Sequence, residues 1–191
     1  MDALSIAVLS SVAAVTVYFA MVYNNLVQVK HNVAKAWANI DVLLKQRHDE
    51  LPKLIDTCRQ YMKFEQDTLT KVMQARSQVS AAREAQNLPA LGAAEQALRS
   101  STGQLFAVAE AYPELKTDQT FLQLQARIAS LENAIADRRE FYNESANVNN
   151  VRIEQFPDVV IASLFAFKPA PLLHFADNEK ADVDVQRAFT A

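Results

Sequence analysis

The feature that most constrains this chain is an apolar run near its N-terminus. Residues 3–22 read ALSIAVLSSVAAVTVYFAMV and contain no charged residue, no proline and no glycine. An α-helix rises about 1.5 Å per residue, so a helix over this run is roughly 30 Å long, the hydrocarbon thickness of a bilayer. The run therefore predicts a transmembrane helix, and we expect residues 1–23 to form a membrane anchor.

Two alternatives to an anchor are a cleaved signal peptide and a buried core helix. A signal peptide needs a positively charged segment before the run and a small-residue cleavage site after it. Only Met1 and Asp2 precede the run, and no A-x-A-like site follows it. The nearest basic residues, Lys30 and Lys35, lie on its carboxyl side. Because basic flanks stay in the cytoplasm, we expect a single-pass protein of the cell membrane, with a cytoplasmic main domain and the N-terminus outside.

The composition of the remaining chain is typical of long helices with few loops. The 191 residues include only two glycines, Gly92 and Gly103, and glycine is what tight turns and phosphate-binding loops require. The formal net charge of −3 argues against nucleic-acid binding, which needs a basic surface. The single cysteine, Cys58, excludes an intramolecular disulfide and CxxC-type metal sites.

Apolar residues after Asn24 recur at steps of three and four, which predicts amphipathic helices. Long helices joined by short turns predict an all-α fold, a long antiparallel up-and-down bundle over residues 24–167. A short extra helix is expected after Pro157, and an extended, partly mobile tail over residues 168–191. The four long helices are expected at residues 24 to about 48, 51 to about 87, 89 to about 112, and 121 to about 156.

The stretch QRHDELPKL, residues 46–54, is predicted to be the corner between the first and second helices. Asp49 suits an N-cap, and Pro52 suits the first turn of a new helix. Arg47 and His48 suit the C-terminus of the preceding helix, where the helix dipole favours positive charge. The stretch is either a charged corner alone or a surface that presents Arg47 and His48 to a partner at the membrane-distal end.

The fourth predicted helix carries a heptad seam that is polar in its second half. Arg138 falls on this seam and is followed by Arg139. The two arginines either contact a partner or lipid headgroups, or form salt bridges with neighbouring acidic residues. The amides near the end of the helix are either buried and hydrogen-bonded, which fixes register, or part of a frayed end. These amides are Asn143, Asn147, Asn149 and Asn150.

The sequence contains no recognisable catalytic or metal-binding motif. His31 and His48 are about 25 Å apart along one predicted helix, and neither they nor His174 belongs to an H-E-x-x-H or E-x-x-H pair. No P-loop, G-x-G-x-x-G or G-x-S-x-G is present. Cys58 falls on an apolar stripe, which predicts a buried, inert thiol. We therefore expect no enzyme activity, cofactor or metal; an enzyme or metal protein within the bundle is the less favoured alternative.

Five motifs, in order along the chain, are specific enough to identify a family. They are YNNLV at 23–27, VAKAWANIDVLLKQRHDELPKLID at 33–56, YPELKTDQTFLQLQ at 112–125, LENAIADRREFYNESANVNN at 131–150 and FPDVVIASLFAF at 156–167. Together they resemble the LemA family of bacterial membrane-anchored helical proteins, over nearly the whole chain up to about residue 175. The chain departs from the LemA pattern at His31, Lys53, Leu173 and His174.

The resemblance implies one N-terminal membrane helix, a helical bundle and no known enzymatic activity. It also implies a role in membrane organisation or membrane stress, and partners among membrane proteins, including peptidases. The LemA pattern includes Pro52 and Pro157 and most of the candidate interaction residues; His48 and Arg138 are added from the corner and the seam. The candidates are Asn24, Trp37, Asp41, Arg47, His48, Asp49, Arg138, Arg139, Tyr142 and Asn143.

These observations favour a non-catalytic, membrane-anchored interaction or scaffold protein. Its expected partners are the bilayer through residues 3–22, further copies of itself, and a membrane protein such as a peptidase, but not nucleic acid. Self-association is expected because an anchor confines the copies and raises their effective concentration. Membrane shaping is the alternative, and it is less favoured because the chain lacks a cluster of four to eight basic residues.

Overall fold

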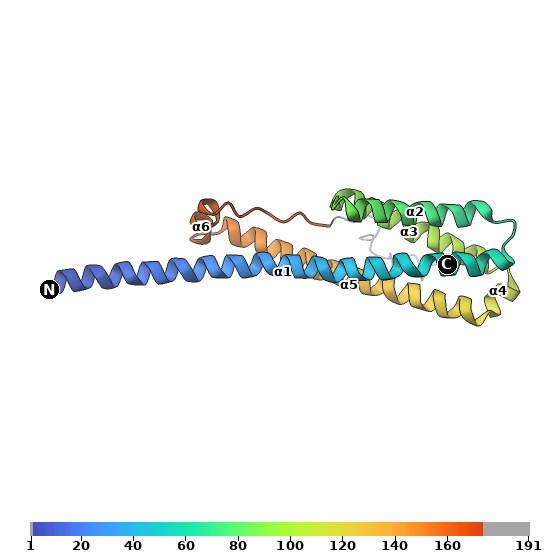
Figure 1. The fold of residues 1–191 in the computed structure, drawn as a ribbon, viewed down its shortest axis with the longest axis horizontal. Helices are drawn as coiled ribbons and strands as arrows, with labels where there is room; N and C mark the ends of the chain where they lie inside the picture. Colours follow the sequence, from blue (N-terminus) through green and yellow to red (C-terminus); the bar gives the residue numbers. More distant parts are fainter. Residues whose placement is uncertain (1, 174–191) are drawn as a thin grey trace, which may run out of the picture. The chain divides into compact units, whose positions relative to one another are not determined.

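The computed structural model describes residues 2–173, which form helices and turns and no strand (Figure 1). The helices are α1 (Ala3–Tyr61), α2 (Gln66–Glu84), α3 (Leu88–Ala109), α4 (Pro113–Thr117), α5 (Gln119–Glu154) and α6 (Asp158–Leu164). The predicted all-α bundle of four long helices is confirmed, as is the short helix after Pro157. The predicted tail from His174 onward lies outside the described residues.

The helices pack as two units. The first contains Met1–Leu43 and Ala134–Leu172, which hold the start of α1, the end of α5 and α6. The second contains Leu44–Asn133, which holds the end of α1, α2, α3, α4 and the start of α5. The predicted domain boundaries after residues 23 and 167 stay predictions.

The apolar run forms the first turns of α1. Within the described part of the chain, α1 is the one helix that is long and apolar enough to cross a bilayer, and none of that stretch is buried by protein. Residues 2–18 are all exposed, and burial begins with Phe19 and Val22. The run is thus a candidate membrane span that continues directly into a packed helix.

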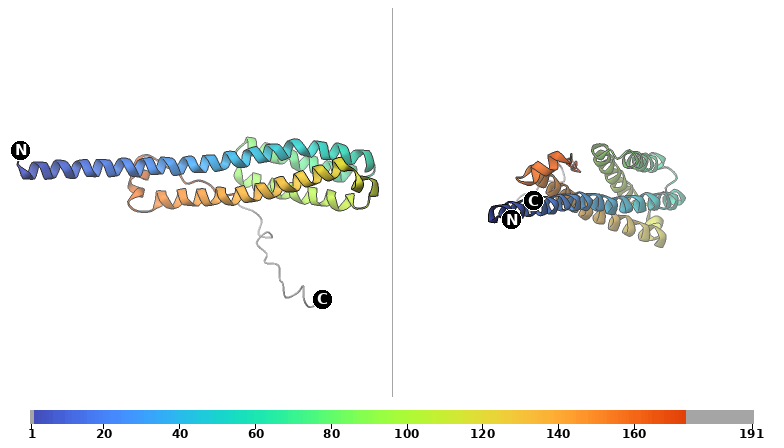
Figure 2. Two further views of the ribbon diagram at one scale, coloured as in Figure 1. Left: turned by 90° about the horizontal axis from the view of Figure 1, so that it is seen from below. Right: turned by 60° about the vertical axis from the view of Figure 1, so that its left-hand side comes forward.

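In the first unit, α1 is antiparallel to α5. The Trp37 ring of α1 packs edge-on against Tyr142 of α5, with centroids 5.9 Å apart, and Asn25 accepts a hydrogen bond from Arg152. Residue numbers therefore fall along α5 as they rise along α1, and the two segments lie side by side in both views (Figures 1 and 2). A small core joins both helices to α6; it consists of Val22, Leu26, Ile153, Ile161 and Ala162.

In the second unit, α2 and α3 form a pair of adjacent helices (Figure 2). Two tyrosines link the turns of this unit: the Tyr61 hydroxyl donates to Asp118 at 3.1 Å, and the Tyr112 hydroxyl donates to Glu65 at 3.3 Å. Every helical segment contributes fully buried apolar side chains to the core. Among them are Leu54, Cys58, Leu69, Val72, Leu98, Leu105, Leu115 and Ile128.

The predicted corner at residues 46–54 is wrong, because α1 continues through this stretch to Tyr61. The buried face of the helix passes through Leu44, Arg47 and Leu51 at steps of three and four, so no register change interrupts it. Asp49 is therefore not an N-cap but an exposed residue in the middle of a helix. Arg47 is buried rather than presented at a helix end.

Pro52 is tolerated inside α1 because a neighbouring helix compensates for it. Proline has no N–H, so in a helix it leaves the carbonyl four residues earlier, here that of His48, without its usual donor. The Nε of Arg76, in α2, donates to the His48 carbonyl oxygen at 2.9 Å. The same guanidinium and burial lower the pKa of the His48 imidazole, burial being the larger cause.

The chain reverses after Tyr61, between α1 and α2, so the predicted helix over residues 51 to about 87 is in fact two helical segments. The reversal contains no glycine or proline. Among the described residues other than glycine, only Gln86 and Ala166 have a positive φ. The turn before α2 therefore uses ordinary backbone conformations and leaves no mark in the sequence.

The break expected between the second and third helices, at about residues 87–89, is confirmed. Gln86 adopts a left-handed conformation with φ 50°, and the Asn87 side chain accepts a hydrogen bond from the Ala90 N–H at 3.1 Å. Pro89 lies in the first turn of α3, where no intrahelical donor is lost. The third helix ends at Ala109, close to the expected end at about residue 112, and Pro113 begins the short helix α4.

The compensation of Pro52 generates a double-mutant test. Arg76→Ala should lower the free energy of unfolding by about 1–3 kcal/mol, because it leaves the His48 carbonyl without a donor. In a Pro52→Ala background the new N–H satisfies that carbonyl, so the same change should have a smaller effect. Urea unfolding of the detergent-solubilised chain, followed by circular dichroism, measures both, with exposed Arg59→Ala as the control. Equal losses in the two backgrounds would show that Arg76 acts through other contacts.

Candidate functional site

A buried ion pair joins α1 to α3 in the second unit. A guanidinium nitrogen of Arg47 donates to a carboxylate oxygen of Glu95, and the two side chains are only 4% and 10% exposed. Removing two charges from water costs several kcal/mol per ion, which only good geometry and further hydrogen bonds offset. The pair therefore fixes which faces of α1 and α3 meet.

Glu132 of α5 extends this pair into a cluster of charges. Burial raises the pKa of the Glu132 carboxyl, while the positive charges of Arg47 and Arg99 lower it and Glu95 raises it further. One Glu132 oxygen and the Nε of Arg47 are buried with no hydrogen-bond partner among the described residues. We call Arg47, Glu95, Arg99 and Glu132 the charge cluster. It draws together α1, α3 and α5, and its incompletely satisfied carboxyl can take up a proton.

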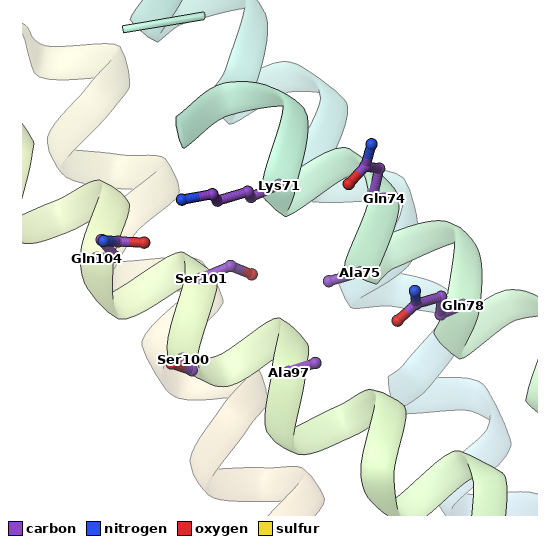
Figure 3. Close-up of a pocket in the computed structure, with 8 residues that line it drawn as sticks. All are labelled: Lys71, Gln74, Ala75, Gln78, Ala97, Ser100, Ser101 and Gln104. Atoms are coloured by element: carbon purple, nitrogen blue, oxygen red, sulfur yellow. The ribbon is translucent and has the colours of Figure 1, made fainter. Parts of the chain in front are cut away.

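A shallow groove of about 340 Å³ lies between α2 and α3 on the surface of the second unit (Figure 3). Its walls carry amides, hydroxyls and small side chains, and its single charged residue is Lys71. The polar lining residues are Lys71, Gln74, Gln78, Ser100, Ser101 and Gln104. Such a surface offers hydrogen bonds to a partner.

The structure resolves the open question of the amides near the end of α5. Asn149 is 4% exposed and donates to the Lys168 carbonyl at 3.3 Å. Asn150 both donates to the Ala170 carbonyl at 2.9 Å and accepts from its N–H at 2.7 Å. The Tyr142 hydroxyl donates to the Pro171 carbonyl at 2.8 Å. The end of α5 is thus not frayed, and two of its four amides, Asn149 and Asn150, bind the extended segment that follows α6.

A second ion pair attaches α6 to the rest of the first unit. Arg152 lies 3.0 Å from the carboxylate of Asp158, which is 4% exposed, and also donates to Asn25 of α1. One guanidinium therefore links α5, α1 and α6. The sequence did not identify Arg152 as a linking residue. One of its partners, Asn25, lies 127 residues before it, and the other, Asp158, lies across the turn between α5 and α6.

The ten candidate interaction residues are divided between the two units. Arg47, His48 and Asp49 belong to the second unit and the other seven to the first. Asn24, Asp49 and Arg138 are exposed, and Arg47 and Tyr142 are buried. The half-buried members are Trp37, Asp41, His48, Arg139 and Asn143. Trp37 and Tyr142 are in contact, and whether any of the ten binds a partner stays a prediction.

The predicted seam of α5 is correct except at Arg138, which is exposed. Beyond Ile135 the half-buried Arg139 takes its place, followed by the buried Tyr142 and Ala146. Tyr142 and Asn149, the later members of the predicted seam, are buried, so the departure is confined to Arg138.

Two sequence signals bear on the buried groups. Arg47 lies three residues after Leu44 and four before Leu51, so a continuous helix would have placed it on the buried stripe and demanded an acidic partner. Nothing in the sequence identifies Glu95 or Glu132 as that partner. Cys58 was predicted to be buried and inert; it is fully buried, and burial raises the pKa of its thiol to about 12.

Among residues 2–173, no group of three or more His, Cys, Asp or Glu side chains is placed to hold a metal ion. The charge cluster supplies two carboxyls, but each faces arginine. The expectation that the chain has no metal, cofactor or enzyme activity stays a prediction.

The Arg47–Glu95 pair predicts a large stability effect. Arg47→Ala should lower the free energy of unfolding by about 3–5 kcal/mol, because it leaves buried carboxylates without their counter-charge. Lys53→Ala, which breaks the exposed Lys53–Glu50 pair in the same helix, is the control and should lower it by about 0–1 kcal/mol. Urea unfolding measures both. Similar losses for the two variants would show that the buried pair contributes no more than an exposed one.

The raised pKa of Glu132 predicts a pH-dependent effect. Above that raised pKa the folded protein holds an ionised carboxyl that burial disfavours, and Glu132→Gln removes it. The variant should therefore unfold at higher urea than the wild type at pH 7, and the difference should vanish as the pH falls below the ordinary pKa of glutamate. Glu140→Gln, at an exposed position of α5, is the control. A difference that grows on acidification would show that the Glu132 carboxylate stabilises the fold.

Comparison with known proteins agrees with this architecture. Protein LemA of Metamycoplasma hominis is 28% identical over 161 residues, which cover 84% of this chain and 73% of that protein. Magnetosome protein MamQ 2 of Paramagnetospirillum magneticum is 30% identical over 96 residues, 50% of this chain and 35% of that protein. Magnetosome protein MamQ of Magnetospirillum gryphiswaldense is 31% identical over 85 residues, 44% of this chain and 31% of that protein.

The chain thus spans most of the LemA relative but less than half of either MamQ protein. The family model is matched over residues 36–187, which exclude the apolar run and include the charge cluster and α6. Because this match covers most of the sequence, the resemblance drawn from the five motifs is confirmed: the chain belongs to the LemA family.

Proposed function

We propose that this protein is a non-catalytic, membrane-anchored interaction protein that self-associates and binds other membrane proteins. One observation supports it above the others: an apolar stretch with no protein partner continues, in the same helix, into a packed bundle. A row of exposed apolar residues of this length is unfavourable in water and matches the thickness of a bilayer. The bilayer is therefore the first partner of the chain.

The polar side chains within the apolar run are compatible with lipid. The Ser10 and Ser11 hydroxyls donate to the Ala7 carbonyl, both at 2.9 Å, and the Thr16 hydroxyl donates to the Val12 carbonyl at 2.8 Å. In a bilayer every donor must be satisfied within the protein, and these three are. Basic residues follow the run at Lys30 and Lys35, so we place the bundle in the cytoplasm and the N-terminus outside.

The surface of the bundle supports binding rather than chemistry. The groove between α2 and α3 offers amides and hydroxyls that hydrogen-bond a protein partner (Figure 3). The charged side chains that are buried are paired inside each unit, as in the charge cluster and at Arg152. Anchored copies meet at high effective concentration, so weak polar surfaces suffice for self-association or for capture of a membrane-bound partner such as a peptidase.

Membrane shaping is the second candidate. It is favoured by exposed apolar side chains on and around α6, and by similarity to two proteins named as magnetosome proteins. Liposomes that keep their shape when the full chain is reconstituted would exclude it.

The proposal predicts that association depends on the anchor. An arginine at the centre of a membrane helix costs about 2.5–3.5 kcal/mol in insertion, so Val12→Arg with Val15→Arg should release the protein from membranes. The matched control, Val148→Arg with Val151→Arg, changes two exposed valines of α5 and should leave it in place. Chemical crosslinking of native membranes, followed by affinity purification and mass spectrometry, should yield multimers or a protein partner for the wild type and the control.

Two results would contradict the proposal. If the wild type is extracted by alkaline carbonate as readily as the anchor variant, the apolar run does not span a membrane. If the wild type stays in the membrane but yields only monomers without a crosslinked protein, and light scattering in detergent also gives a monomer, the interaction function is wrong.

A further inference from the structure

The strongest unassigned feature of the first unit is an apolar surface on and around α6. Phe156, Val160, Leu164 and Phe165 are 83%, 58%, 68% and 48% exposed. Val160 and Leu164 are four residues apart in α6 and therefore lie on one side of it, while Phe156 stands in the turn before the helix and Phe165 directly follows it. We call these four residues the α6 patch. Apolar side chains that are this exposed and this close together mark a surface that meets a partner.

The α6 patch lies where the candidate membrane span ends. The Phe165 ring packs on Phe19 with centroids 6.1 Å apart and on Tyr23 at 4.6 Å. Tyr23 also packs edge-on against Phe167 at 6.1 Å. Phe19 and Tyr23 bracket the last residues of the apolar run, so the patch is level with one boundary of the proposed bilayer core. Aromatic rings are enriched at this boundary in membrane proteins.

The α6 patch is held in place by its buried side. Ile161 and Ala162 pack into the core formed with Val22, Leu26 and Ile153, and Asp158 pairs with Arg152. Beyond α6, Asn149 and Asn150 bind the backbone of residues 168 and 170. Both ends of the segment from Asp158 to Ala170 are therefore attached to α5. The exposed side of α6 carries the apolar side chains of the patch.

The charge distribution matches a lipid surface. Between Gln155 and Phe167 the only charged residue is Asp158, and it is buried and paired. The exposed side of this segment thus carries no charge, whereas Lys168 directly follows it at an exposed position. At the boundary of a bilayer, apolar side chains are buried below the headgroups, and a lysine ammonium lies among the lipid phosphates.

We propose that the α6 patch inserts into the boundary between headgroups and acyl chains, beside the anchor, as a second membrane contact. The proposal rests on the anchoring proposed above, because the level of the patch is defined by the end of the apolar run. With two contacts, the first unit is held against the bilayer surface and no longer turns freely about a single helix. A second copy of the chain or a protein partner is the competing occupant.

Depth-dependent quenching of a fluorophore tests the proposal. Single cysteines are introduced into the full chain at Leu164 in the patch, Val12 in the middle of the apolar run, and Phe141 on α5. The native Cys58 is fully buried and should not label in the folded protein. Each variant is labelled with NBD and placed in phosphatidylcholine–phosphatidylglycerol nanodiscs that carry spin-labelled lipid. The Phe141 position is exposed, like the patch, and serves as the control. It lies roughly 16 Å along α5 from Arg152, on the side away from the membrane end, because Arg152 contacts Asn25 just beyond the apolar run.

The expected result is a graded response. A lipid spin-labelled near the headgroup should quench the Leu164 probe at least about two-fold more than the Phe141 probe, because only the former enters the boundary. A spin label deep in the acyl chains should quench the Val12 probe most. Leu164→Cys is at an exposed position, and circular dichroism checks that each variant is folded.

Three outcomes would overturn the inference, and they separate it from the proposed anchoring. If the Val12 probe is quenched but the Leu164 probe behaves like Phe141, the anchor stands and the α6 patch does not touch lipid. If the Leu164 probe is blue-shifted yet unquenched, protein covers the patch. If the Val12 probe is not quenched, the anchor itself is wrong, and the inference is wrong with it.

Discussion

Both units contain part of α1, so both depend on this helix being continuous. A continuous helix has to provide a hydrogen-bond partner for its backbone carbonyls along its whole length. In the apolar run the helix does this alone, and Ser10, Ser11 and Thr16 turn their hydroxyls back onto its carbonyls. At Pro52 it does so with help, because Arg76 donates to the carbonyl that the proline leaves open. An α1 that ended at Pro52 would give a different second unit, since Leu54 and Cys58 are core residues in the continuation of the helix.

In each unit, buried charged side chains help to determine which helix faces pack together. In the second, Arg47 and Glu95 select which faces of α1 and α3 meet, and Glu132 adds α5 to the same contact. In the first, Arg152 ties α6 to α5 and α1. Apolar stripes alone pack in several registers that differ little in energy, whereas a buried ion has one acceptable partner. The ion pairs therefore account for uniqueness more than for stability.

The first unit concentrates the features that face the proposed bilayer. The end of the apolar run, the rings of Phe19 and Tyr23, and α6 are all within one small core and its aromatic border. The amides of α5 then bind the segment after α6. The proposed function therefore draws on different properties of the two units: apolar exposure in the first, and a polar surface over a closed core in the second.

The helical class, the apolar run and most helix ends followed from the sequence, because they depend on local chemistry. Apolar periodicity predicts helices wherever it occurs. The start of α3 is also set locally, because the Asn87 side chain caps the helix and Pro89 lies in its first turn. The seam of α5 was predicted correctly except at Arg138 for the same reason. The family resemblance added candidate residues that periodicity alone does not provide.

The path of α1 through Pro52, the pairing of Arg47 and the role of the α5 amides were decided only by the tertiary structure. Each depends on a group distant in sequence: Arg76 for the His48 carbonyl, Glu95 for Arg47, and the backbone of Ala170 for Asn150. The sequence shows that Pro52 lacks a donor and that Arg47 lies on an apolar stripe. It does not show which partner is near enough to make either one favourable, because that proximity exists only once the helices have packed.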